Sequence, residues 1–109
     1  MDRLGMLRKM AAAKPDDPFP AYGLAMELAK QGELEEARQT FAGLVERQPG
    51  YIPAYLMFGN LLVRMGQRDE ASSTYVAGIE AAAKAGDDHA RSELEGALDE
   101  LGPAPGGDA

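Results

Sequence analysis

The sequence contains no cysteine and only one histidine, His89. The absence of cysteine excludes disulfide bonds, thiolate metal ligands and cysteine nucleophiles, and it suits a reducing compartment, so a cytoplasmic location is expected. A single histidine cannot build a histidine-rich metal site, and any Ser-His-Asp triad would depend on His89 alone. We therefore expect no catalytic residue, no bound metal and no cofactor.

Basic residues are also scarce, because 11 Lys and Arg stand against 18 Asp and Glu for a net charge of −7. The charge is unevenly spread: residues 1–14 carry +3, residues 15–84 carry −4 and residues 85–109 carry −6. Nucleic-acid affinity depends largely on Lys and Arg that neutralise phosphates, so no nucleic-acid partner is expected. The opposite charges of the two end regions leave head-to-tail self-association open as an alternative function.

Long apolar runs are missing as well, since no stretch approaches the roughly 18 to 20 apolar residues that a membrane-spanning helix needs. The opening segment, residues 1–6, does not resemble a signal peptide. We therefore expect a soluble, unprocessed protein.

What the sequence does contain is helix-forming residues. Ala, Leu, Met, Glu and Arg are frequent, whereas Val, Ile and Thr are few, and this balance favours helix over strand. A length of 109 residues suits one domain with a modest core. The expected fold class is therefore all-α, and without strands no phosphate-binding loop of the strand–loop–helix type is expected.

The sequence repeats itself at an offset of 34 residues. The aligned pairs include Leu24 with Phe58, Ala25 with Gly59, Leu28 with Leu62, Gly32 with Gly66, Glu36 with Glu70, Ala37 with Ala71 and Phe41 with Tyr75. The same offset carries Phe41 back to Leu7 and Leu44 back to Met10, so the first residues correspond to the second half of a unit.

Each unit has the pattern of a helical hairpin. In the first unit an apolar stripe runs into Gly32, which can adopt the left-handed conformation that ends a helix. A second stripe then follows, with acidic residues in its first turn, and Pro49 stops it.

These residues resemble the tetratricopeptide repeat. Tyr55-x2-Phe58-Gly59-x2-Leu62 followed by Ala71-x3-Tyr75 is similar to the signature of that family, and so is Leu24-Ala25-x2-Leu28 followed by Ala37-x3-Phe41 and Pro49. The resemblance implies a right-handed α-solenoid. Its parts would be a partial repeat over residues 1–17, full repeats over 18–51 and 52–85, a capping helix over 86–101 and a disordered tail over 102–109.

Two residues depart from the signature. Ala83 stands where the second repeat should have its proline, so the helix before it should run on towards Gly86 and displace the final helix. Arg3 stands where the partial repeat should have alanine.

Other candidate sites have simpler interpretations. His89 aligns with Tyr55, which indicates a packing or half-exposed residue, and one residue of the Asp87-Asp88 pair is expected to cap the final helix. Pairs such as Glu35-Glu36 are interpreted as solvated helix surface. The basic residues near Leu7 and Met10 could form a membrane-surface helix, but the repeat places both residues inside, so membrane contact is not expected as a primary role.

The remaining candidate is a groove, because in this family the first helices of successive hairpins line a concave surface. The resemblance therefore predicts a non-catalytic adaptor that binds a partner protein or peptide. Members that clamp a C-terminal carboxylate use Lys and Asn in this groove, whereas this chain offers Asn60 but has Tyr22 and Leu56 in place of lysines. An amphipathic helix or apolar peptide is the expected ligand, and occupation by the chain's own final helix or tail is the alternative. The residues assigned to the groove are Phe19, Tyr22, Met26, Lys30, Leu56, Asn60, Val63 and Arg64, with Ala90 and Leu94 as an extension.

Overall fold

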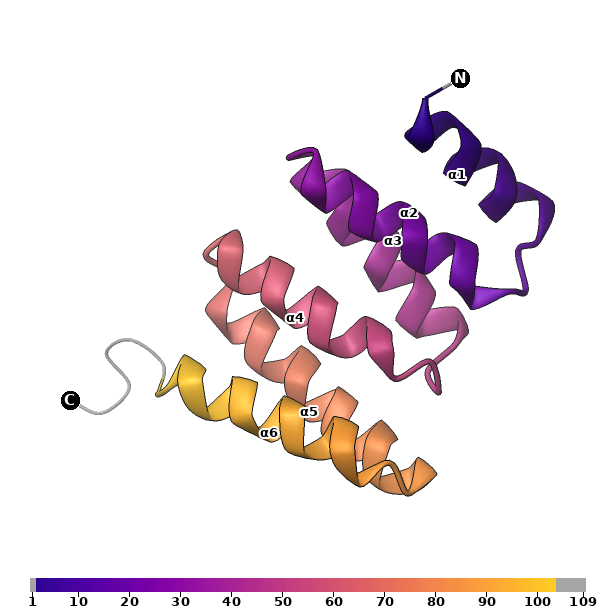
Figure 1. Ribbon diagram of the computed structural model, residues 1–109. Coiled ribbons are helices and arrows are strands. Elements are labelled where there is room, and N and C mark those ends of the chain that lie inside the picture. The colour runs from indigo at the N-terminus through magenta and orange to yellow at the C-terminus, as the bar shows by residue number, and fades with distance from the viewer. Residues whose placement is uncertain (1, 104–109) are drawn as a thin grey trace.

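The computed structural model describes residues 2–103, and within that range it consists of helices and connecting turns without strands (Figure 1). The expected all-α solenoid of helical hairpins is confirmed. The expected disordered tail lies, from residue 104 onwards, outside the described residues. The helices are α1 (Arg3–Ala13), α2 (Pro18–Lys30), α3 (Leu34–Arg47), α4 (Pro53–Arg64), α5 (Arg68–Ala85) and α6 (Asp88–Leu101).

Helices α2 and α3 form one hairpin, and α4 and α5 form the next. Gly32 and Gly66 occupy the two turns with φ of 84° and 78°, a region that an L side chain enters only with strain. The residues that follow, Glu33 and Gln67, donate backbone hydrogen bonds to Leu28 and Leu62 at 2.9 Å and 2.8 Å. The two turns therefore repeat at the 34-residue offset, because each needs a glycine at the same place.

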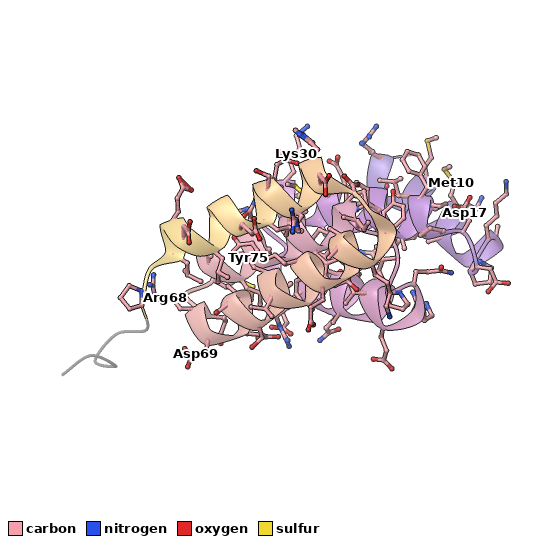
Figure 2. The ribbon with its side chains drawn as sticks, turned by 90° about the horizontal axis from the view of Figure 1, so that it is seen from below. Met10, Asp17, Lys30, Arg68, Asp69 and Tyr75 are labelled. Atoms are coloured by element: carbon pink, nitrogen blue, oxygen red, sulfur yellow. The ribbon has the colours of Figure 1, made fainter. Side chains whose placement is uncertain are left out.

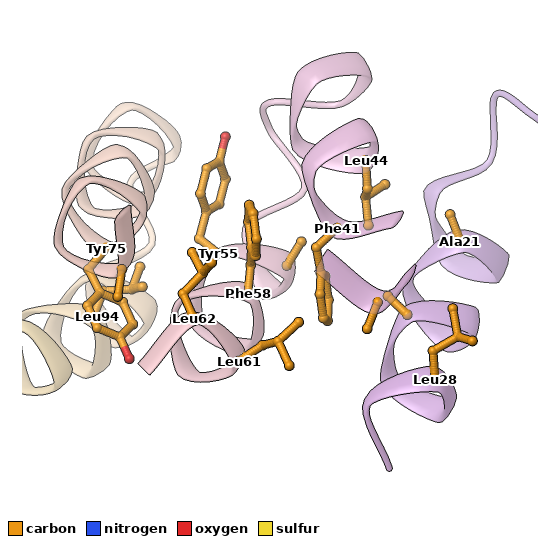
Figure 3. Close-up of a cluster of buried hydrophobic side chains, with 14 of the residues drawn as sticks. Ala21, Leu28, Phe41, Leu44, Tyr55, Phe58, Leu61, Leu62, Tyr75 and Leu94 are labelled. Atoms are coloured by element: carbon orange, nitrogen blue, oxygen red, sulfur yellow. The ribbon is translucent and has the colours of Figure 1, made fainter. Parts of the chain in front are cut away.

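The core runs along the stack between the helices, from α2 through α3 and α4 to α5 and α6 (Figure 3). Phe41 and Phe58 stack with ring centroids 5.7 Å apart and join the two hairpins. Small side chains allow the helices of each hairpin to approach, since Ala25 and Ala37 are fully buried and so is Ala71. The alignment of small residues in the sequence is therefore a packing signal.

Helix α1 packs against α2 at one end of the stack. A methyl group on Gly23 would lie 3.3 Å from Leu7 Cδ2, and Arg3 Nε donates to Glu27 Oε1 at 2.9 Å. Met10, which the repeat predicted to lie inside, is instead 48% exposed, although the aligned Leu44 is 1% exposed. The prediction was wrong because α3 packs between α2 and α4, whereas within residues 2–103 α1 packs against α2 alone.

At the other end of the stack, Ala83 stands where the repeat signature has a proline. Helix α5 runs to Ala85, a turn beyond the place where its counterpart α3 stops, and α6 follows almost at once, as expected. The Asp87 carboxylate accepts a hydrogen bond from Ala90 N at 3.0 Å and caps α6. Leu94 packs closely over α5, since a methyl group on Gly78 would lie 3.0 Å from Leu94 Cδ1.

The longer α5 moves α6 out of the 34-residue register. The burial pattern shows the change, because the side chain of His89 is 87% exposed, whereas Tyr55, its counterpart by the offset, is 5% exposed. The interpretation of His89 as a packing or half-exposed residue was therefore wrong, because the side chain is almost fully exposed. No helix within residues 2–103 is long and apolar enough to cross a membrane.

Candidate functional groove

The first helices of the hairpins, α2 and α4, form one face of the stack, and α6 continues that row (Figure 1). Helix α4 contacts both α2 and α6, while α3 and α5 lie behind. The surface of α2, α4 and α6 is called the groove below. Three cavities open along it.

The α4–α6 cavity has a volume of about 320 Å³ and an apolar floor. Leu56 and Met57 of α4 face Ala90 and Leu94 of α6 across it, and Tyr22 of α2 closes one side. Its α6 rim is acidic and comprises Asp87, His89 and Glu93, with His89 Nε2 3.6 Å from Glu93 Oε1.

The α2–α4 cavity has a volume of about 230 Å³ and the opposite charge at its rim. Met26 and Ala29 of α2 and Met57 and Leu61 of α4 line it, with Phe41 below. Lys30 and Arg64 stand at the edge, and Arg64 Nη1 donates to the Ala29 carbonyl at 2.9 Å, which fixes the guanidinium over the gap between the helices.

A third cavity of about 400 Å³ lies between α4, α5 and the last turn of α6. The Tyr75 hydroxyl donates to Asn60 Oδ1 at 2.6 Å, so the amide group of Asn60 is oriented with its nitrogen available as a donor. Burial raises the pKa of Tyr75, and nearby Glu100 raises it further, so the hydroxyl stays protonated and keeps this bond. Arg68 donates to the carbonyl of Leu101 and fixes the end of α6 at the far side (Figure 2).

Tyr22 is held in place by two other aromatic rings. Its ring meets Tyr51 edge-on at 5.5 Å and Phe41 edge-on at 6.4 Å, both between centroids. Burial, with a smaller contribution from Tyr51, raises the pKa of the Tyr22 hydroxyl. Tyr22 is therefore a rigid, neutral wall of the α4–α6 cavity.

The eight residues assigned to the groove from the sequence divide among these cavities. Tyr22 and Leu56 line the α4–α6 cavity, while Met26, Lys30, Asn60 and Arg64 line the α2–α4 cavity. Asn60 and Val63 line the third cavity. Phe19 is 66% exposed and lines none of the three.

The sequence reasoning missed Met57, which lines both the α4–α6 and the α2–α4 cavities. The repeat alignment hid it, because its counterpart in the first unit is Gly23, which packs against α1. The acidic rim was missed as well, since it depends on where α6 lies. Ala90 and Leu94 line the α4–α6 cavity together with Leu56 and Met57, and α6 packs beside α4.

A sequence model of the tetratricopeptide repeat matches residues 28–94. The chain belongs to the tetratricopeptide repeat family. The solution structure of a tetratricopeptide repeat domain protein from Salinibacter ruber is 38% identical, with a TM-score of 0.77 over 81% of this chain and 89% of that one. No curated protein matches the chain.

Two structures of more distant sequence show the same fold. The TPR2B domain of yeast Sti1, solved as a complex with pHsp70, is 18% identical, with a TM-score of 0.83 over 90% of this chain and 78% of that one. PcrH, solved with the chaperone binding region of PopD, is 14% identical, with a TM-score of 0.81 over 90% of this chain and 74% of that one. Within residues 2–103 no group of three His, Cys, Asp or Glu side chains is placed to hold a metal ion.

Proposed function

We propose that this tetratricopeptide repeat chain is a non-catalytic adaptor that binds a segment of a partner protein in the groove. The observation that carries the proposal is the pair of apolar cavities that open to solvent between α2, α4 and α6. The solved complexes of PcrH with the chaperone binding region of PopD and of the Sti1 TPR2B domain with pHsp70 support it, because in each a protein of this fold is bound to a partner. The cysteine-free composition suits a cytoplasmic place of action.

The residues that line the two cavities indicate which ligand is expected. Each accepts an apolar side chain, and their shared wall at Met57 places the two anchors close together along the partner segment. Lys30 and Arg64 favour an acidic residue beside one anchor, whereas Asp87 and Glu93 favour a basic residue beside the other. The ligand is therefore an amphipathic segment bound in one direction, and clamping of a terminal carboxylate is disfavoured because Tyr22 and Leu56 replace the required lysines.

The test is a change at the floor of the α4–α6 cavity. A partner recovered by co-purification from the native host supplies a peptide whose binding is measured by calorimetry. Leu56→Glu is expected to weaken binding by at least about tenfold, because burying a leucine side chain contributes roughly 1.5 to 3 kcal/mol.

The matched control is Val76→Glu, which places the same charge on α5 at a side chain that is 43% exposed and lines none of the three cavities. It should bind as the unchanged chain does. A Leu56→Glu variant that binds with unaltered affinity would show that the groove is not the binding site.

A further inference from the structure

The α4–α6 cavity and the third cavity are two parts of one furrow between α4 and α6, called the α4–α6 furrow below. Leu56 and Ala90 line its first part, at the N-terminal halves of the two helices, and Val63 and Leu101 line its second part, at their C-terminal halves. The two helices therefore pack side by side and run in the same direction. The furrow continues for about three helical turns, because its apolar residues on α6 recur every three or four positions. These residues are Ala90, Leu94, Ala97 and Leu101.

The α6 side of the furrow is acidic. Asp87 and Glu93 line the first part, and Glu100 lines the second. Glu93 has only His89 beside it, and within residues 2–103 neither Asp87 nor Glu100 forms an ion pair. Glu93 and Glu100 are seven residues apart, which places them about 10.5 Å apart along the helix axis. The α6 side thus presents carboxylates at a regular spacing, opposite uncharged side chains of α4.

Positive charge is scarce in the furrow. Among the described residues that line it, Arg68 is the only Lys or Arg. Arg68 donates to the carbonyl oxygens of Leu101 and, at 3.4 Å, of Pro103, so its guanidinium group is held at the end of α6. Lys30 and Arg64 line the α2–α4 cavity and not the furrow. The furrow is therefore complementary to an apolar surface with positive charge along one edge.

We propose that the α4–α6 furrow binds a basic amphipathic helix of the partner protein, lying along α4 and α6. This inference rests on the proposed function and names the class of its ligand. Apolar side chains at helical spacing enter the α4–α6 cavity and the third cavity. Lys or Arg residues two turns apart on the partner helix pair with Glu93 and Glu100.

A helix fits this furrow better than an extended segment does. The walls of the furrow are themselves helices, and their backbone groups are already paired within each helix. An extended segment would bury its own N–H and C=O groups there with few partners, whereas a helix pairs these groups internally. The side chains of a helix also pack between the rows of side chains on α4 and α6. The ligand is therefore helical where it contacts α6.

The first test compares three synthetic peptides of about 14 residues, or four helical turns, whose binding to the full chain is measured by fluorescence anisotropy. The first peptide has leucine at helical spacing and lysine at its other positions. The second has glutamate in place of lysine, and the third alternates leucine and lysine, a pattern that favours a strand. The first peptide is expected to bind at least about tenfold more tightly than either of the others.

The second test changes the carboxylates of the furrow. Glu93→Gln/Glu100→Gln is expected to weaken binding of the first peptide by about three- to tenfold. The matched control is Glu95→Gln/Asp99→Asn, which changes the net charge of α6 equally at two exposed residues that line none of the three cavities. This control should bind the peptide nearly as tightly as the unchanged chain does. Equal weakening by the two double variants would overturn the proposal, because it would show attraction to the acidic protein as a whole.

The remaining outcomes separate this inference from the proposed function. A first peptide that does not bind, or that binds no more tightly than the second or the third, would rule out the basic helix. So would a native partner whose binding is lost with Leu56→Glu but unaffected by Glu93→Gln/Glu100→Gln, and in that case the groove would remain the binding site. A native partner that neither variant affects would overturn both the basic helix and the proposed function.

Discussion

Gly59 and Gly96 both lie inside helices, but their surroundings give them opposite roles. A methyl group on Gly59 would lie 2.6 Å from Tyr75 Cδ1, within a contact where α4 and α5 approach closely. A methyl group on Gly96 of α6 would meet nothing within 4 Å. The repeat alignment pairs Gly59 with Ala25, which is also small and is fully buried, whereas Gly96 aligns with Leu62 and has no such small counterpart.

The change Gly59→Ala is expected to destabilise the fold by about 1 to 3 kcal/mol, because the buried Tyr75 ring must move and its hydrogen bond to Asn60 is strained. Gly96→Ala should stabilise it by about 0.5 to 1 kcal/mol, because alanine loses less backbone entropy in a helix. Urea denaturation of the two variants measures both values. Equal effects of the same sign would contradict this account of the two positions.

Residues whose role depends on a neighbouring element were harder to predict than residues of the repeat. Met57 was missed because its function as a shared wall arises only when α2 and α6 stand on either side of α4. Met10 was misplaced because the alignment assumes that every second helix packs between two first helices. The offset identifies the type of position, but the burial of that position depends on what covers it.

Among the helices, α5 and α6 depart most from the repeat. The sequence predicted the departure from Ala83, and the structure confirms that α5 continues to Ala85. The register of α6 could not be derived, because it depends on the short connection at Gly86 and Asp87 and on the packing of Leu94. The exposure of His89 and the acidic rim both follow from that register.

Deleting residues 87–101 is expected to abolish the cooperative thermal transition. Leu94 is 1% exposed and packs beside Gly78 and Tyr55, so removing α6 would expose the core of the second hairpin. Circular dichroism during heating is the measurement. A shortened chain that keeps a sharp transition would show that the two hairpins are stable without α6.

The variant Leu94→Ala removes one buried side chain of α6 and keeps the helix. It should cost about 2 to 5 kcal/mol, the usual range for truncating a buried leucine, while the helices remain. The comparison separates the loss of one side chain from the loss of the whole element.

Across the whole molecule, burial is greatest in the middle and least at α1. Six residues of α4 are buried, whereas no residue of α1 is. The sequence indicated this gradient only in part, since it identified an incomplete first repeat but placed Met10 in the core. A linear stack distributes stability along its length, because each helix contacts mainly its neighbours.

Amide hydrogen exchange should therefore show fast opening of α1 and slow opening of α4 in dilute solution. Local detachment of α1 breaks only its contacts with α2 and the Arg8–Glu36 pair. Mass spectrometry of the exchanged peptides gives the protection of each helix. Uniform protection at low concentration would mean that the chain opens as a single unit.

Met57, the wall between the two apolar cavities, gives the groove a property that neither cavity has alone. Met57 lines both cavities, and methionine turns about several single bonds, so a change of its rotamer alters the space on both sides. For the proposed two-anchor ligand, the free energies of filling the two cavities should therefore be coupled, so that its affinity is not the sum of the contributions of its two anchors. Selectivity for such a ligand would then depend on the sizes of the two anchors taken together and not on either one alone.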